Sequence, residues 1–107
     1  MTVDKAALLA RRLGEDEHEI EGFGSVRLRS LSRAEVLALQ KLNDTAESDR
    51  RMVSLCLIGP FTLTEDEVGI WQENSPPMEI ERLTVAIRDL SGMGPGAAKS
   101  GVPGVRE

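Results

Sequence analysis

The sequence has 107 residues, of which 40% are hydrophobic and 29% are charged. This length allows one small hydrophobic core, and this composition is typical of a chain that folds. A net charge of -5 disfavours nucleic acid as the main partner, because an acidic surface repels phosphates.

A single cysteine and a single histidine exclude an internal disulfide and a Cys/His zinc cluster. The sequence shows neither an apolar run near the ~20 residues of a membrane span nor an apolar leader after Met1. We therefore expect an intracellular, soluble protein that does not contact a membrane.

The first predicted element is a short helix over residues 5–13. Asp4 is placed to cap it, Val3 and Leu8 have the spacing of a hydrophobic staple, and Gly14 follows as a stop signal. A helix this short is marginally stable by itself.

A β-hairpin is predicted next, over about residues 17–29. Its loop is taken as Gly22, Phe23 and Gly24, one of the common hairpin lengths. One face of the hairpin is then apolar apart from His18, and helices must cover it because two strands alone are barely stable. The expected register sets Glu21 opposite Ser25, Ile20 opposite Val26, Glu19 opposite Arg27, His18 opposite Leu28, and Glu17 opposite Arg29.

A complete helix-start signature follows the hairpin. The Ser32 hydroxyl can accept a hydrogen bond from the Glu35 backbone, the Glu35 side chain can reach back, and Leu31 can pack on Val36. This pattern predicts a helix that runs to about Asn43.

The third predicted helix begins at a cap, either Asp44 or Thr45. It carries the most apolar stretch of the chain, residues 52–58, and is expected to stop at Gly59 and Pro60. We expect the centre of the core there.

A second start signature, in residues 63–68, opens a short helix that carries Ile70 and Trp71. Ser75, with Pro76 at the first helical position, is expected to start the last helix. That helix places Ile80, Leu83, Ile87 and Leu90 on one stripe and ends at Ser91 and Gly92.

The last sixteen residues differ in composition from the rest, because half of the ten glycines lie in residues 92–107. Such a segment cannot offset its ordering entropy by burial. We therefore predict one domain over residues 1–91 and a flexible tail over 92–107. The predicted fold is α+β and mainly α, with four to five short helices packed on one N-terminal hairpin.

Catalytic side chains are scarce. With one histidine, one cysteine and no tyrosine, only carboxylates or a Ser/Lys arrangement remain for catalysis. The acidic residues 15–21 form a charge ladder on the hairpin, and residues 65–67 oppose a helix dipole. His18 is interpreted as a partly buried residue, and Cys56 as a core residue. We expect no enzyme, no metal and no cofactor.

The order of the segments resembles the tail assembly chaperones of long-tailed, siphovirus-type bacteriophages. An acidic stretch leads into the hairpin, then come capped helices, the apolar run and a closing helix. The resemblance covers roughly residues 17–92, and the segments that carry it are residues 25–29, 31–35, 51–58, 61–68 and 90–92. The sequence departs from the family in its short link at Gly59 and Pro60 and in its C-terminal tail.

The resemblance implies a non-enzymatic protein of the host cytoplasm that is absent from the mature virion. Members of that family bind the tape measure protein, keep it soluble and help recruit tail tube subunits. Many are also made in a longer, frameshifted form, which a flexible C-terminus would suit. The resemblance transfers no binding residue position by position.

Four apolar residues are candidates for the protein-binding surface: Ile70, Trp71, Met78 and Val85. We expect a modest apolar groove with an acidic rim, walled by the Trp71 helix and the last helix. Two other readings stay open, namely a small acidic regulator, such as an antitoxin or anti-repressor, and a carboxylate enzyme with a divalent cation. Self-association is left open as well.

Overall fold

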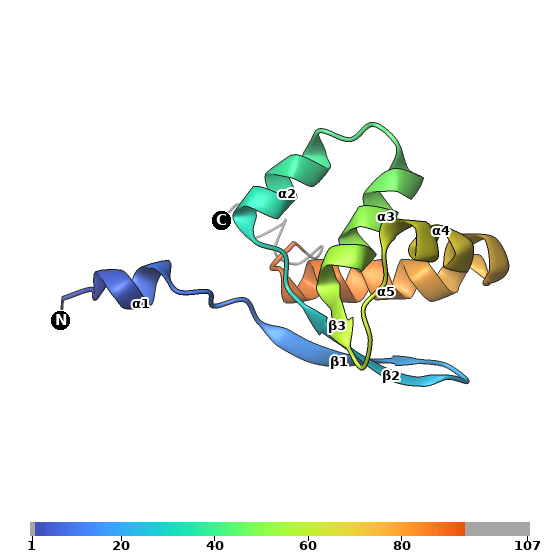
Figure 1. The fold of residues 1–107 in the computed structure, drawn as a ribbon, viewed down its shortest axis with the longest axis horizontal. Coiled ribbons are helices and arrows are strands. Elements are labelled where there is room, and N and C mark those ends of the chain that lie inside the picture. The colour runs from blue at the N-terminus through green and yellow to red at the C-terminus, as the bar shows by residue number, and fades with distance from the viewer. Residues whose placement is uncertain (1, 94–107) are drawn as a thin grey trace, which may run out of the picture.

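The computed structural model describes residues 2–93, and these residues confirm the predicted fold class, α+β and mainly helical (Figure 1). The predicted tail lies outside the described residues from residue 94 onward. The elements in chain order are α1 (Lys5–Leu9), β1 (Glu15–Ile20), β2 (Gly24–Arg29), α2 (Arg33–Gln40), α3 (Thr45–Cys56), β3 (Leu57–Gly59), α4 (Glu65–Asn74) and α5 (Pro77–Leu90).

The hairpin forms with its apolar face inward as predicted, but its predicted register is wrong by two residues. Val26 lies opposite His18, not Ile20, and Ile20 lies opposite Gly24. The turn is closed by the Phe23 N–H, which donates to the Ile20 carbonyl at 2.9 Å. Gly22 (φ 86°) and Gly24 (φ 115°) adopt left-handed conformations that this turn requires.

The shifted register changes the ion pairs on the outer face of the hairpin. Glu17 lies opposite Arg27 and Glu15 opposite Arg29, so the two predicted cross-strand pairs are wrong. Arg27 binds Glu15 at 3.0 Å, diagonally across the strands. Arg29 instead contacts Glu35 of α2, and its two terminal guanidinium nitrogens, Nη1 and Nη2, each donate to the Glu35 carboxylate at 2.9 Å.

A third strand replaces the end of the predicted third helix. The helix ends at Cys56, and Leu57–Gly59 forms β3, which pairs antiparallel with β2 in a sheet of order β1-β2-β3. The helical reading of residues 57–58 is therefore wrong. A short apolar run fits a helix or a strand equally well, and here pairing with the free edge of β2 satisfies its backbone.

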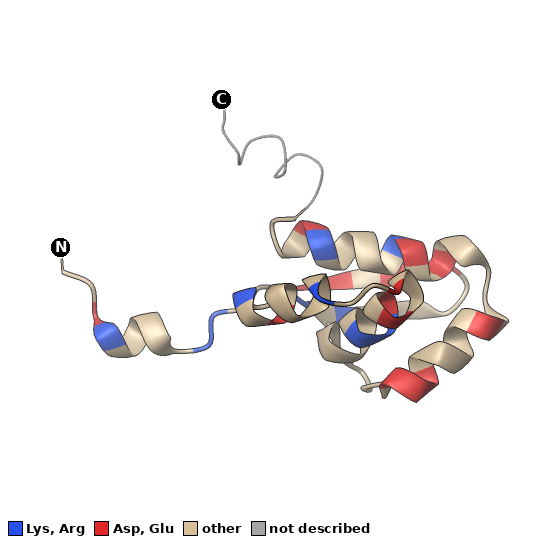
Figure 2. Ribbon diagram, turned by 90° about the horizontal axis from the view of Figure 1, so that it is seen from above, with Lys and Arg blue, Asp and Glu red and all other residues tan. Residues whose placement is uncertain are grey.

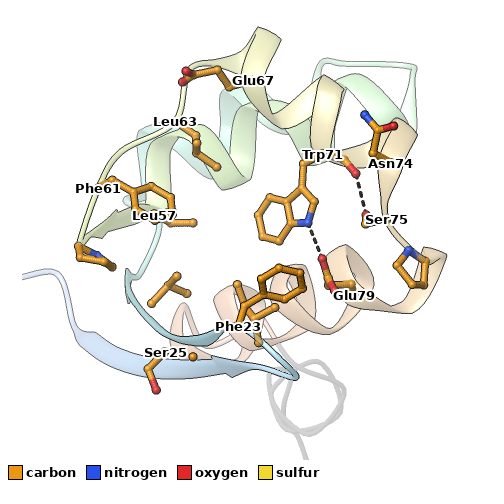
Figure 3. Close-up of a pocket in the computed structure, with 15 residues that line it drawn as sticks. Phe23, Ser25, Leu57, Phe61, Leu63, Glu67, Trp71, Asn74, Ser75 and Glu79 are labelled. Carbon is orange, nitrogen blue, oxygen red and sulfur yellow. Dashed lines mark hydrogen bonds between the residues drawn. The ribbon is translucent and has the colours of Figure 1, made fainter.

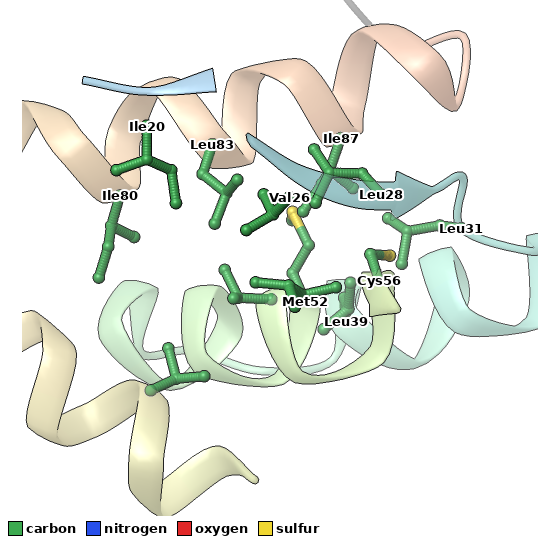
Figure 4. Close-up of a cluster of buried hydrophobic side chains, with 13 residues drawn as sticks. Ile20, Val26, Leu28, Leu31, Leu39, Met52, Cys56, Ile80, Leu83 and Ile87 are labelled. Carbon is green, nitrogen blue, oxygen red and sulfur yellow. The ribbon is translucent and has the colours of Figure 1, made fainter. Parts of the chain in front are cut away.

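The core lies between α3 on one side and the hairpin with α5 on the other (Figure 4). Its side chains come from every element except α1, and the apolar stripe predicted on α5 is buried at Ile80, Leu83 and Ile87. The other core residues are Ile20, Val26, Leu28, Leu31, Leu39, Met52, Val53, Cys56, Leu57 and Val68.

The first helix is shorter than predicted and ends at Leu9, so Gly14 is not its stop. Asp4 is at the cap position, but its side chain makes no capping hydrogen bond. The predicted staple is also wrong, because Val3 and Leu8 are 72% and 54% exposed. In Figure 1, α1 projects away from the rest of the structure.

The two predicted capping boxes are confirmed, at Ser32 with Glu35 on α2 and at Thr64 with Glu67 on α4. Asp44 caps α3 through the Ala46 N–H. The last helix begins one residue later than predicted: Pro76 is its cap and Pro77 its first residue. None of the helices in residues 2–93 is long and apolar enough to cross a membrane.

Alanine at Gly69, inside α4, is expected to raise the free energy of unfolding by about 0.5–1 kcal/mol, because glycine is a poor helix former. The new Cβ would lie 3.3 Å from Cδ of Arg50, a flexible side chain that can move aside. As a contrast, Gly24→Ala is expected to lower the free energy of unfolding by about 1 kcal/mol, because an L-residue is strained at φ 115°. Urea titration measures the free energy of unfolding of both variants. Changes of the same sign in the two variants would contradict the prediction.

Candidate functional site: an aromatic groove

An open groove of about 510 Å³ lies between the tip of the hairpin, the loop after β3, α4 and the start of α5 (Figure 3). We call it the aromatic groove. Its lining is mostly apolar and comprises Ile20, Phe23, Gly24, Ser25, Val26, Leu57, Pro60, Phe61, Leu63, Glu67, Trp71, Asn74, Ser75, Pro76 and Glu79.

All three aromatic residues of the chain, Phe23, Phe61 and Trp71, line this groove. They come from three separate segments: the hairpin turn, the β3–α4 loop and α4. Phe23 is 83% exposed and Phe61 is 53% exposed, so both rings leave apolar surface in water. Exposed aromatic side chains gathered on one concave surface are typical of a protein interaction site.

The indole of Trp71 is fixed at the back of the groove. Its Nε1–H donates to the Glu79 carboxylate of α5 at 2.5 Å, and its backbone carbonyl accepts from the Ser75 hydroxyl at 2.7 Å. Figure 3 shows both bonds and the indole pointing into the groove. Trp71 is therefore held in place by the protein itself, and a side chain fixed in this way loses little entropy on contact with a ligand.

The charges within the groove are negative. Among its described lining residues only Glu67 and Glu79 are ionisable, and both are carboxylates. Glu67 closes the capping box of α4 by accepting from the Thr64 N–H at 2.9 Å, while Glu79 holds Trp71. An apolar segment with basic residues beside it complements these charges.

The structure distributes the four predicted binding residues unevenly. Trp71 lines the aromatic groove. Met78, 51% exposed, lines a smaller hollow of about 370 Å³ that shares Ile20, Pro76 and Glu79 with the groove. Ile70 and Val85 are exposed but line neither hollow.

Sequence reasoning missed the half of the groove that the hairpin and the β3–α4 loop supply. A signal was present: Phe23 lies between two glycines in a tight turn, and Phe61 follows Gly59 and Pro60. An aromatic residue at a turn has no regular core face to occupy. Its exposure can therefore be expected to serve binding.

Two other side chains with reactive groups are Cys56 and His18. Burial raises the pKa of the Cys56 thiol to about 11, so the thiol stays protonated at neutral pH. His18 lines the smaller hollow, and its partial burial lowers the pKa of the imidazole. Within residues 2–93, no three His, Cys, Asp or Glu side chains are grouped so that they could hold a metal ion.

Compared with protein-family models, with curated proteins and with solved structures, the chain gives no significant match.

Proposed function

We propose that the protein binds an apolar segment of another polypeptide in the aromatic groove and catalyses no reaction. The observation that carries this proposal is the gathering of all three aromatic side chains on one open surface, two of them more than half exposed. Burying such rings against a partner supplies most of the free energy in many protein interfaces.

A polypeptide suits the groove better than a small molecule does. A ligand pocket encloses its ligand between buried walls, whereas Phe23 stands 83% exposed at the hairpin tip. A ring in that position can cover one side of a helix or an extended segment that passes over the groove. The net charge of -5 would keep the complex dispersed.

The proposed partner follows from the resemblance to tail assembly chaperones. A tape measure protein is long and largely helical, and its apolar stripes would aggregate if they were left uncovered. We propose that this chain covers such stripes in the host cytoplasm, keeps the client soluble and helps recruit tail tube subunits. The order of the segments in the sequence supports this, and the groove supplies the binding surface.

The test is co-expression with a tape measure protein, which the proposal expects a long helical reading frame beside this gene to encode. The variant Phe23→Ser with Phe61→Ser is expected to reduce the co-purified client about tenfold or more, as loss of interface anchors does. Because both rings are exposed, the variant should keep the stability of the wild type, which thermal unfolding checks.

The matched control is Ile70→Ser with Met78→Ser, which removes two apolar side chains outside the groove that are 60% and 51% exposed. It is expected to leave client recovery within about twofold of the wild type. The opposite ranking of the two variants would place the binding surface on α4 and α5 outside the groove. A gene neighbourhood without a long helical reading frame would contradict the tail-chaperone identity but not peptide binding.

A further inference from the structure

The N-terminal segment is an apolar helix without a partner in the described part of the chain. No residue of α1 is buried, and Val3, Leu8 and Leu9 are 72%, 54% and 73% exposed. A five-residue helix is marginal alone in water, and packing against another surface would stabilise it.

The charges of this segment complement those of the aromatic groove. Lys5, Arg11 and Arg12 outnumber its single carboxylate, Asp4. Figure 2 shows basic positions in blue on α1 and on the link that follows it. The groove carries only carboxylates among its ionisable lining residues. An apolar segment flanked by basic residues therefore complements the groove in charge and in character.

The link to β1 makes docking within the same chain strained. The Gly14 carbonyl accepts from the Ser30 N–H at 2.7 Å, which fixes Gly14 at the open end of the hairpin. Phe23, in the turn at the other end of the hairpin, is separated from Gly14 by β1, whose six residues span about 20 Å. Residues 10–14 reach at most about 17 Å when fully extended. The groove of a second copy is free of this constraint.

We infer that α1 of one copy docks in the aromatic groove of a second copy, with Leu8 and Leu9 against Phe23, Phe61 and Trp71. The exchange is reciprocal, so two copies close into a symmetric dimer. This inference uses the same groove as the proposed function but does not depend on it, since no client is needed. A client with a similar apolar and basic segment would compete with α1.

The test is sedimentation of the full chain without client, at concentrations up to about 1 mM, where even weak contacts are populated. The wild type is expected to be a dimer. Two double variants are each expected to be monomers. Leu8→Asp with Leu9→Asp removes the apolar surface of α1, and Phe23→Ser with Phe61→Ser removes two aromatic rings of the groove. The control Leu37→Asp, at a 44% exposed position on α2, is expected to remain a dimer.

Mixing the two monomeric variants is the decisive step, because one retains an intact groove and the other an intact α1. The mixture is expected to form a dimer again, held by one docking interaction. A wild-type monomer, dimers that survive the Leu8 and Leu9 substitutions, or a mixture that stays monomeric would overturn the inference. A monomer whose Trp71 fluorescence responds to those substitutions would show docking within one chain.

Discussion

Replacing Leu83 with alanine is expected to lower the free energy of unfolding by about 2–4 kcal/mol, the usual cost of a cavity in a tight core. Leu83 is fully buried on α5, which contacts α3 and both long strands. A domain of this size has a total stability of roughly 5–15 kcal/mol. The substitution therefore removes a large share of it.

The matched control is Val85→Ala on the same helix. Val85 is 40% exposed, so its truncation leaves no closed cavity and should change stability by less than about 0.5 kcal/mol. Urea denaturation of both variants gives the comparison. Equal losses would mean that the side of α5 carrying Val85 is covered by something absent from the described structure.

Replacing Glu35 with glutamine is expected to lower the free energy of unfolding by about 2–3 kcal/mol at neutral pH. The reason is that the ion pair with Arg29 joins β2 to α2 in a partly buried position. The side chains of Arg29 and Glu35 are only 11% and 22% exposed. The hydrogen bonds that Arg29 donates lower the pKa of Glu35 to about 2, although burial acts in the opposite direction. Glutamine can still close the capping box, so the variant isolates the loss of charge.

The same pair predicts how stability depends on pH. Because the folded-state pKa lies below the ordinary value of 4.5, the stabilisation is complete above that value and is lost as the pH falls toward about 2. The stability gap between the wild type and Glu35→Gln should therefore shrink over this range.

Glu67→Gln provides the control for this prediction. Glu67 closes the equivalent capping box on α4 but forms none of the ion pairs found in residues 2–93. Its replacement should change stability by less than about 0.5 kcal/mol at any pH. If the difference in stability between the wild type and Glu35→Gln stays constant between pH 5 and about 2, the role assigned to the Arg29–Glu35 ion pair is contradicted.

Local signals in the sequence predicted most of the helical structure. Both capping boxes depend on residues three positions apart, and the α5 stripe depends on helical spacing alone. Such features are independent of the rest of the fold. The first helix shows the limit of this reasoning, because its end and staple depend on a packing surface, and no residue of α1 is buried in the described structure of one copy.

The errors in the sheet have a different origin. A shift of two residues in the hairpin keeps every side chain on its own face, so the alternation of residues 17–29 fits both registers. The choice between them depended on how the glycines close the turn. Strand β3 depended on the free edge of β2, which is distant in sequence.

The aromatic groove was predicted only at Trp71 because it joins segments far apart in the chain. The hairpin turn, the β3–α4 loop and α4 all line the groove, and β3 pairs with β2 between the hairpin and that loop. The position of Phe61 therefore depends on a strand that the sequence reasoning read as helix. The apolar positions that sequence analysis favoured, Ile70 and Val85, are exposed on helices but outside the groove.

The most direct measurement of groove binding is photo-crosslinking with p-benzoylphenylalanine in place of Phe23, during co-expression with the proposed client, a tape measure protein. Position 23 is exposed at the groove, so the larger aromatic side chain fits there without disturbing the core. We predict crosslinks from position 23 to apolar segments of the client and few from the same probe at position 70. Crosslinks from position 70 with none from position 23 would show that the client binds elsewhere.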